Sequence, residues 1–276
     1  MGKCKYCGES AGFLSKKHKE CELKYISAKE QLIQEIEQSI VSGKDLQFLS
    51  NKIETVSHSS FIKGEERNTL LALGFEKAVE KFLEDGVLSP EEEDYASEFI
   101  GHFSLSQEDL SINDSFNRVV KGSILREVMN GNIPEGKVQI DGALTFNLQK
   151  SEIIVWLFND VDFFEQTTRT EFRGGSQGVS IKVAKGVYYR TGAFRGHPVK
   201  TEEMVYKGSG PMLITNKHIY FGGPKAFRTR FDKIVSFNPY EDGIGIQKDG
   251  VTAKPQVFKN LDGWFCYNLL SNLSQM

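Results

Sequence analysis

The stretch GPMLITNKHIYFGG, residues 210–223, decides the fold of the C-terminal part of the chain. An apolar run at 212–215 leads into the polar Thr215-Asn216-Lys217, and a second apolar and aromatic run follows. Runs of this composition are typical of strands, and a short polar connection between two of them is typical of a hairpin. The stretch therefore predicts strand, turn and antiparallel strand.

The same texture continues on both sides of this hairpin. Upstream, β-branched or aromatic runs occur at 153–158, 179–183 and 186–189, and downstream at least three more strands are predicted, with turns at 238–239, 241–243 and 248–250. The chain then returns to a helical pattern, in which Asp262 caps a helix and Phe265, Leu269 and Leu273 share one face. This order predicts a small, strongly bent sheet whose open end is filled by a helix.

The hairpin and the segment after it resemble the pleckstrin-homology-like superfold, particularly its bacterial and GRAM-type members, over about residues 178–276. The residues that carry the resemblance are Leu213-Ile214-Thr215-Asn216 with Ile219 and Phe221, then Asp232-Lys233-Ile234-Val235-Ser236. The resemblance implies an antiparallel β-barrel or sandwich capped by a helix. It also implies an anionic ligand, bound near the first strand–loop–strand of the domain.

Residues 26–135 have the apolar spacing of helices. Asp45 and Ser106 are predicted N-caps, and Ser89, with Pro90 after it and Glu92 three positions on, predicts a capping box. The phrase D-G-x-L-S-x-E-E resembles the TerB-like helical domains over about residues 60–130. That resemblance leaves a divalent cation open at the acidic cluster Asp85, Glu91, Glu92, Glu93 and Asp94; a carboxylate-rich helix N-terminus is the interpretation we favour.

Three of the four cysteines lie in the first 21 residues. Cys4 and Cys7 form a C-x2-C pair, and His18 and Cys21 form a second pair with the same spacing. Two such pairs can close a tetrahedral site around one zinc ion, with no position open for catalysis. The spacing therefore predicts a structural Cys3His zinc knuckle at residues 1–25; a redox pair of Cys4 and Cys7 is the alternative.

Basic residues concentrate in the predicted β domain. One set surrounds KVAKGVYYRTGAFRGHPVK, and in the segment AFRTRFDK the arginines alternate with Phe227 and Phe231, so that they point away from the buried face. Guanidinium groups suit an anionic ligand such as a lipid headgroup, a phosphate or an acidic protein. The candidate ligand-binding residues are Lys182, Lys185, Arg190, Arg195, His197, Arg228 and Arg230, with Lys225 and Lys233 beside the last two. A solvated polar face is the alternative.

The net charge of −3 combines basic ends with an acidic stretch at 26–150. The longest apolar run, at 153–158, is too short to cross a membrane, and no signal peptide is recognisable. We therefore expect a cytoplasmic α+β protein of several domains: a zinc knuckle (1–25), a helical domain (26–135), connecting strands (136–177) and a pleckstrin-like domain (178–276). The layout resembles modular bacterial proteins.

The expected function is that of an adaptor or sensor, without catalysis, that binds a protein or an anionic ligand through the β domain, with peripheral membrane contact left open. Two other classes remain. A nucleic-acid binder would use the lysines of residues 1–25. An enzyme would need a pocket in which His197 or His218 meets carboxylates, because the sequence contains no linear catalytic motif.

Overall fold

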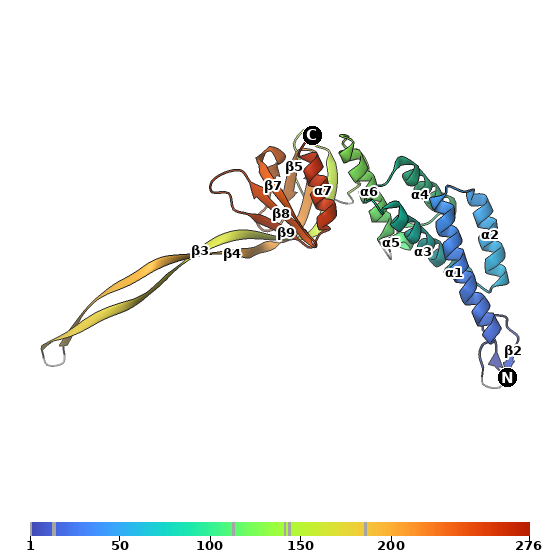
Figure 1. The fold of residues 1–276 in the computed structure, drawn as a ribbon, viewed down its shortest axis with the longest axis horizontal. Coiled ribbons are helices and arrows are strands. Elements are labelled where there is room, and N and C mark those ends of the chain that lie inside the picture. The colour runs from blue at the N-terminus through green and yellow to red at the C-terminus, as the bar shows by residue number, and fades with distance from the viewer. Residues whose placement is uncertain (1, 13–14, 112–113, 141, 143–144, 185–186) are drawn as a thin grey trace. The chain divides into compact units, whose positions relative to one another are not determined.

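The computed structural model describes residues 2–12, 15–111, 114–140, 142, 145–184 and 187–276, and for residues 111, 169–184 and 187–200 it describes the backbone but not the side chains. The chain divides into two compact units, Met1–Lys137 and Val138–Met276 (Figure 1). The first unit is helical, and the second is built on one antiparallel sheet.

The helical unit begins with a two-stranded hairpin, β1 (Gly2–Lys3) and β2 (Ser10–Gly12). Its helices within the described residues are α1 (Lys19–Val41), α2 (Leu46–Ser59), α3 (Gly64–Phe82), α4 (Pro90–Phe103), α5 (Gln107–Ser111) and α6 (Ser115–Met129). Helix α1 thus runs through the boundary that the sequence places between a zinc knuckle and a helical domain.

Side-chain caps determine where several helices begin. The Asp45 carboxylate accepts a hydrogen bond from the backbone N–H of Gln47, 2.8 Å away. Ser89 and Glu92 form the predicted capping box, with Ser89 N donating to the Glu92 carboxylate at 2.8 Å and Glu92 N donating to Ser89 Oγ at 3.2 Å. Ser106 caps α5 in the same way, accepting from Asp109 N. These caps confirm the sequence prediction.

The core of the helical unit lies between α1 and α3, with α2 and α4 packed on the same cluster. Ile36 of α1 is fully buried, and a Cβ added at Gly74 of α3 would lie 2.5 Å from its Cγ2 atom. Gly74 therefore lets the two helices approach closely, at a position where the sequence shows only an isolated glycine in a helical pattern.

The second unit contains a sheet of seven strands in the order β6-β5-β4-β3-β9-β8-β7, with neighbours antiparallel. The strands are β3 (Ile154–Ala184), β4 (Val187–Thr215), β5 (His218–Phe221), β6 (Phe227–Arg230), β7 (Ile234–Tyr240), β8 (Gly243–Lys248) and β9 (Gln256–Lys259). A short 3₁₀ helix, η1 (Phe231–Lys233), joins β6 to β7, and helix α7 (Gly263–Leu273) ends the unit. Strand β3 begins within the segment 136–177 that the sequence assigns to connecting strands.

The hairpin at residues 210–223 forms as predicted. Strands β4 and β5 pair through Met212 with Phe221 and Ile214 with Ile219, around the turn after Thr215. The predicted turn at Asn238-Pro239 is wrong, because both residues lie inside β7. Strand β7 is the last strand in the sheet order, so its outer side has no ladder partner and proline, which lacks an N–H group, is tolerated there.

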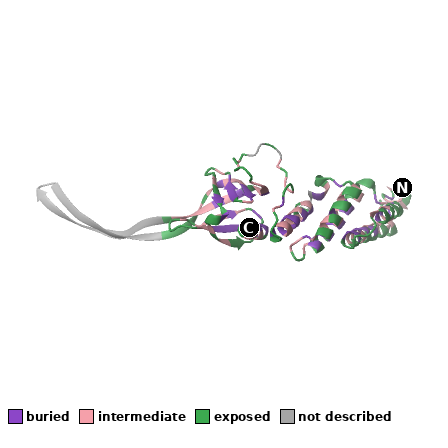
Figure 2. Cartoon of the chain, turned by 90° about the horizontal axis from the view of Figure 1, so that it is seen from above, coloured by how far each residue is buried: buried purple, intermediate pink, exposed green. Residues whose placement is uncertain are grey.

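The sheet is curled, and α7 lies against β7 and β8 (Figure 1). Aromatic side chains form the core of the unit. Phe163 of β3 lies 5.2 Å, centroid to centroid, from each of Phe221, Phe227 and Phe258. The predicted face of α7 is buried, with Phe265 packing edge-on against Trp156 of β3 at 5.0 Å. Buried residues accordingly gather on the strands of the curled sheet (Figure 2). The expected barrel or sandwich is thus a curled antiparallel sheet with a helix against it.

A substitution at the start of α7 tests this packing. A Cβ added at Gly263 would lie 1.9 Å from the backbone O of Tyr240 and 2.6 Å from that of Gly243. We expect Gly263→Ala to destabilise the sheet unit by about 1–3 kcal/mol, measured by urea unfolding followed through Trp156 and Trp264. A control, Gly101→Ala in α4, places its Cβ in open space and should stabilise the helical unit by about 0.5–1 kcal/mol, measured by the helical circular dichroism signal because both tryptophans lie in the sheet unit. Equal stability of Gly263→Ala and wild type would contradict the packing.

Candidate functional site

The four predicted metal ligands come together at the N-terminus of the helical unit. Cys4 and Cys7 lie in the loop between β1 and β2, His18 is the N-cap residue of α1, and Cys21 lies in the first turn of that helix. Gly8 has a φ of +79°, which lets the chain turn back after Cys7. One ligand atom from each of the four residues lies within 4.8 Å of all the others.

These distances fit a tetrahedral metal ion. Bonds of about 2.3 Å to sulfur and 2.0–2.1 Å to nitrogen imply a sulfur–nitrogen edge of about 3.5 Å in a tetrahedral zinc site. The Nδ1 atom of His18 lies 3.4 Å from Cys7 Sγ and 3.7 Å from Cys21 Sγ. The group can therefore bind a metal ion with three sulfur ligands and one nitrogen ligand.

The surroundings of the ligands favour metal binding as well. His18 Nε2 lies 3.0 Å from the carbonyl O of Ser10, which can only accept a hydrogen bond, so Nε2 carries the proton and Nδ1 is left for a metal. Burial raises the pKa of the Cys4 thiol, but backbone N–H groups of Cys7, His18 and Tyr6 outweigh it and lower the pKa to about 6. Burial and the neighbouring thiols Cys7 and Cys4 raise the pKa of Cys21 to about 11. A cation at the centre would relieve this repulsion.

The acidic cluster at the start of α4 has structural partners. Glu92 completes the capping box, Asp85 accepts a hydrogen bond from Val87 N, and Glu93 pairs with Arg126 and Lys137, both at 2.5 Å. Within the described part of the chain, the Cys/His group is the one cluster of potential ligands close enough to hold an ion. These contacts agree with the interpretation of a capped, carboxylate-rich helix start.

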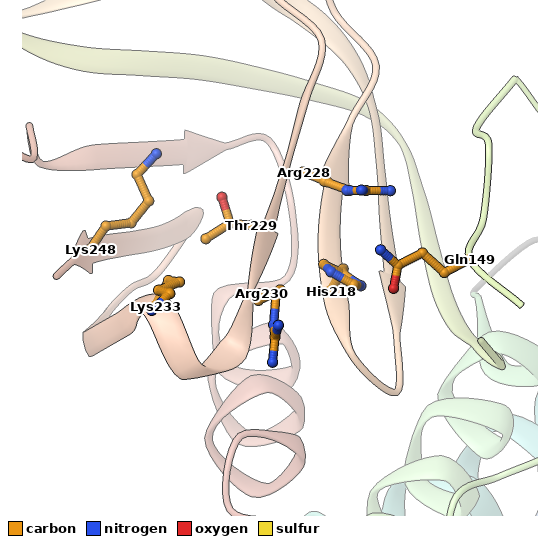
Figure 3. Close-up of a pocket in the computed structure, with 7 residues that line it drawn as sticks. All are labelled: Gln149, His218, Arg228, Thr229, Arg230, Lys233 and Lys248. Atoms are coloured by element: carbon orange, nitrogen blue, oxygen red, sulfur yellow. The ribbon is translucent and has the colours of Figure 1, made fainter. Parts of the chain in front are cut away.

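A basic hollow of about 500 Å³ lies on the sheet unit (Figure 3). Strand β6 lines it with Arg228, Thr229 and Arg230, and other elements add Lys233 from η1 and Lys248 from the end of β8. The remaining two lining residues are His218 of β5 and Gln149 of the segment before β3. Four cationic side chains thus line this hollow, with Lys233 and Lys248 on one side of β6 and Arg228 on the other (Figure 3), and none of the seven lining residues is acidic.

The predicted ligand-binding residues fall into two groups. Arg228 and Arg230 line the hollow, and both are exposed, as their alternation with Phe227 and Phe231 predicts. Lys233, from the same predicted set, lines it as well, whereas Lys225 does not. The side chains of Lys182, Arg190, Arg195 and His197, and the whole of Lys185, lie outside the described residues.

A buried carboxylate beside this hollow was not predicted from the sequence. The side chain of Glu152 has no exposed surface, and that of His218 is 3% exposed. One oxygen, Oε1, lies 2.6 Å from His218 Nδ1 and 2.9 Å from Thr215 Oγ1; the other, Oε2, accepts from Tyr220 OH at 2.6 Å and from the backbone N of Gln149 at 2.5 Å. The hydrogen bond to Glu152 therefore fixes the position of the His218 ring, and His218 lines the hollow.

Hydrogen bonding keeps this carboxylate ionised. Burial raises the pKa of Glu152, but the hydrogen bonds from Tyr220, the Gln149 backbone, His218 and Thr215 outweigh it and lower the pKa to about 2. Burial and the Glu152 charge together raise the pKa of Tyr220. A lone glutamate before a strand gives no sequence signal for such a network, because its side-chain partners are 63 to 68 positions away.

A second hollow, of about 420 Å³, adjoins the first, since both include Gln149, His218 and Arg230 in their lining. Asp232, Leu273 and Met276 line its far side. The ring of His218 is therefore at the boundary between a cationic hollow and one with mixed lining. Arg230 makes an ion pair with Asp232 at 3.0 Å, and both side chains are largely exposed.

Among the described residues, no helix combines the length and the apolar character needed to cross a bilayer. Comparisons with protein families, with curated proteins and with solved structures found no match.

A metal ion bound by the four residues of the Cys/His group predicts a stoichiometry of one ion per chain. We expect the purified chain to retain one metal ion after gel filtration, and Cys21→Ala to lose it and to lower the melting temperature of the helical unit, because α1 starts at the site. Mass spectrometry for metals and circular dichroism measure the two effects. Cys266→Ala, which removes a buried thiol of α7, is the control and should keep the ion. Full metal content in the Cys21→Ala variant would rule out the site.

The low pKa of Glu152 predicts a pH dependence of stability. An ionised Glu152 stabilises the folded sheet unit at any pH above its unfolded pKa of about 4.3. This contribution disappears as the pH falls from there to about 2. We expect Glu152→Gln to lower the urea midpoint at neutral pH, and its difference from wild type to shrink in acid. Tryptophan fluorescence follows the unfolding. A difference that grows in acid would contradict the assignment.

Proposed function

We propose that the protein is a binding module whose sheet unit recognises a ligand carrying phosphoryl groups in the basic hollow. The helical unit, stabilised by a metal ion at its N-terminus, would present a second surface to a protein partner, so that the chain acts as an adaptor or sensor. This is the adaptor function expected from the sequence. Only some of the residues that line the proposed binding site were predicted from the sequence.

The observation that carries the proposal is the convergence of four cations without an acidic residue in the lining. Arg228, Arg230, Lys233 and Lys248 all line this hollow, and within the described residues only Arg230 of the four makes an ion pair, with the largely exposed Asp232, so an anion bound there would gain from several positive charges. Guanidinium groups bind phosphate oxygens in pairs, and lysines add point charges. Lys248 lies over the ring of Phe227 at 5.4 Å, which keeps its ammonium group at the edge of the hollow.

The enzyme alternative gains one feature and lacks others. An enzyme would need a histidine beside a carboxylate, and His218 and Glu152 form such a pair. However, no serine, cysteine or carboxylate is among the described residues that line the basic hollow, and Asp232 and Ser274 line only the adjoining one. Recognition of an anion needs only the groups that are present, so we favour binding over catalysis.

The ion at the N-terminus is proposed to be zinc in a structural role. Three thiolates and one imidazole are the donors that zinc prefers, and four protein ligands leave no position for a substrate. The ring of Tyr6, beside the site, packs against Tyr25 of α1 at 4.9 Å, so the knuckle is joined to the helices. We also propose, from the sequence resemblance, that the units correspond to a zinc knuckle, a TerB-like domain and a pleckstrin-like domain.

A phosphoryl group can come from a membrane lipid or from a soluble compound, and one experiment separates them. Binding is measured to vesicles that contain phosphatidic acid, with phosphatidylcholine vesicles as reference, and to soluble pyrophosphate by calorimetry. We expect Arg228→Gln/Arg230→Gln to weaken binding about tenfold or more, since hydrogen bonds to charged groups are worth about 1.5–3 kcal/mol each. Binding to vesicles alone identifies a lipid, and binding to pyrophosphate alone a soluble ligand.

The control removes equal charge elsewhere in the unit. Lys225 and Lys254 are exposed and do not line the hollow, so Lys225→Gln/Lys254→Gln should bind like wild type. Equally weakened binding in both double variants would mean that binding depends on the overall charge of the unit and not on this hollow. Absence of binding to vesicles and to pyrophosphate in the wild type would overturn the proposed function.

A further inference from the structure

The hydrogen bonds of Glu152 fix the tautomer of His218. An ionised carboxylate can only accept hydrogen bonds, so the contact of 2.6 Å between Glu152 Oε1 and His218 Nδ1 requires the proton to be on Nδ1. Because the side chains of His218 and Glu152 are both buried, the imidazole is held in one orientation. The second ring nitrogen, Nε2, is then the atom that gains or loses a proton when His218 changes charge.

The imidazole lines the hollow together with the two arginines. In the ladder between β5 and β6, His218 pairs with Arg230 and Tyr220 pairs with Arg228, which places these four side chains on one face of the hairpin. Figure 3 shows His218 between Arg228 and Arg230, with the Gln149 amide beyond it. A neutral Nε2 offers a lone pair to an anion, whereas a protonated Nε2 offers a hydrogen bond and a positive charge.

The charges around His218 come from every element that packs on it. Glu152, from the segment before β3, is the carboxylate in contact with the ring, and Asp232 of η1 lines the adjoining hollow. The cations that share these two hollows are Lys217, Arg228, Arg230, Lys233 and Lys248, and the remaining titratable neighbour is Tyr220 of β5.

We propose that the hollow binds its tetrahedral, doubly charged oxyanion together with one proton, which His218 takes up at Nε2, so that this histidine is a direct ligand of the anion. The inference rests on the proposed function, since it adds a ligand and a proton to the same site. An anion in the hollow offsets the surrounding cations and accepts a hydrogen bond from Nε2. Binding and protonation then strengthen each other, as linked equilibria must.

This linkage determines the direction in which anion affinity changes with pH. At any pH low enough for the ring to be charged before the anion arrives, the anion binds without taking up a proton. At a pH where the ring of the free protein is neutral, each bound anion must bring one proton, so the affinity falls as the pH rises, by at most about tenfold per pH unit. Arginine and lysine keep their charge over the range in which histidine titrates and contribute no such slope.

Sulfate is the suitable probe, because it carries no proton of its own at these pH values, whereas phosphate does. The dissociation constant of the full chain for sulfate is measured by NMR titration at about pH 5.5 and about pH 8, on both sides of the histidine range. We expect affinity to fall at least fivefold at the higher pH in the wild type. His218→Asn, whose amide can still donate to Glu152, should bind sulfate with little change between the two values.

A matched control and a second readout keep the test decisive. His102 of α4 is hydrogen bonded to Ser50 in the helical unit, so His102→Asn should keep the wild-type pH dependence. In the wild type, the ring nitrogens of His218 should change from the Nδ1–H pattern to that of an imidazolium when sulfate is added at about pH 7, just above the histidine range. This readout needs no variant that could fail to fold.

The outcomes separate the two proposals. Sulfate binding that is equally strong at both pH values, or an unchanged pH dependence in His218→Asn, would overturn the role of His218 and leave the anion site in place. No sulfate binding at either pH, with pyrophosphate or vesicle binding retained, would also overturn the role of His218, whereas loss of all three would overturn the proposed function itself.

Discussion

The sheet unit depends on the hydrogen bonds around one buried carboxylate. An ionised glutamate without exposed surface is strongly destabilising unless its oxygens are hydrogen bonded. Glu152 meets this condition through Thr215 in the turn, His218 and Tyr220 of β5, and the backbone of Gln149. The same bonds hold the segment before β3 over β5, where Phe146 packs on Tyr220 at 5.7 Å. They thereby orient His218 and place Gln149 at the rim of the basic hollow.

In the helical unit, the polar centre is the Cys/His group at the N-terminus. The β1–β2 hairpin is too short to bury a core of its own, and its two strands contribute five residues in all to the ladder region. A metal ion held by Cys4, Cys7, His18 and Cys21 would link this hairpin to the first turn of α1 with bonds that no apolar contact of this size could replace. In each unit, therefore, one polar centre fixes a segment that lies outside the apolar core.

Local sequence patterns were sufficient for features that depend on neighbours in the chain. The capping box at Ser89, the hairpin at residues 210–223 and the ligand spacing of the Cys/His group each lie within a stretch of fewer than twenty residues, and the structure agrees with each. Features that depend on pairing over longer distances were missed or wrong. Asn238-Pro239 reads as a turn locally, yet lies in an edge strand that tolerates proline.

The composition of the hollow shows why the site was predicted only in part. Alternation along AFRTRFDK was enough to predict that Arg228 and Arg230 are exposed, but Lys248 lines the hollow from β8, whose ladder with β7 has an irregularity between Ile234 and Ser236. The two-residue turn at Glu241-Asp242 alone would pair Ile234 with Asp249; the irregularity pairs it with Lys248. Glu152, likewise, meets partners from the hairpin only after the sheet has formed.

The central claim, that the basic hollow is an anion site, is tested most directly by a crystal structure of the full chain grown with pyrophosphate. The account predicts tetrahedral density within hydrogen-bonding distance of Arg228 and Arg230, with His218 Nε2 facing an anion oxygen. An ordered pyrophosphate bound elsewhere on the chain, with the hollow holding only solvent, would contradict it.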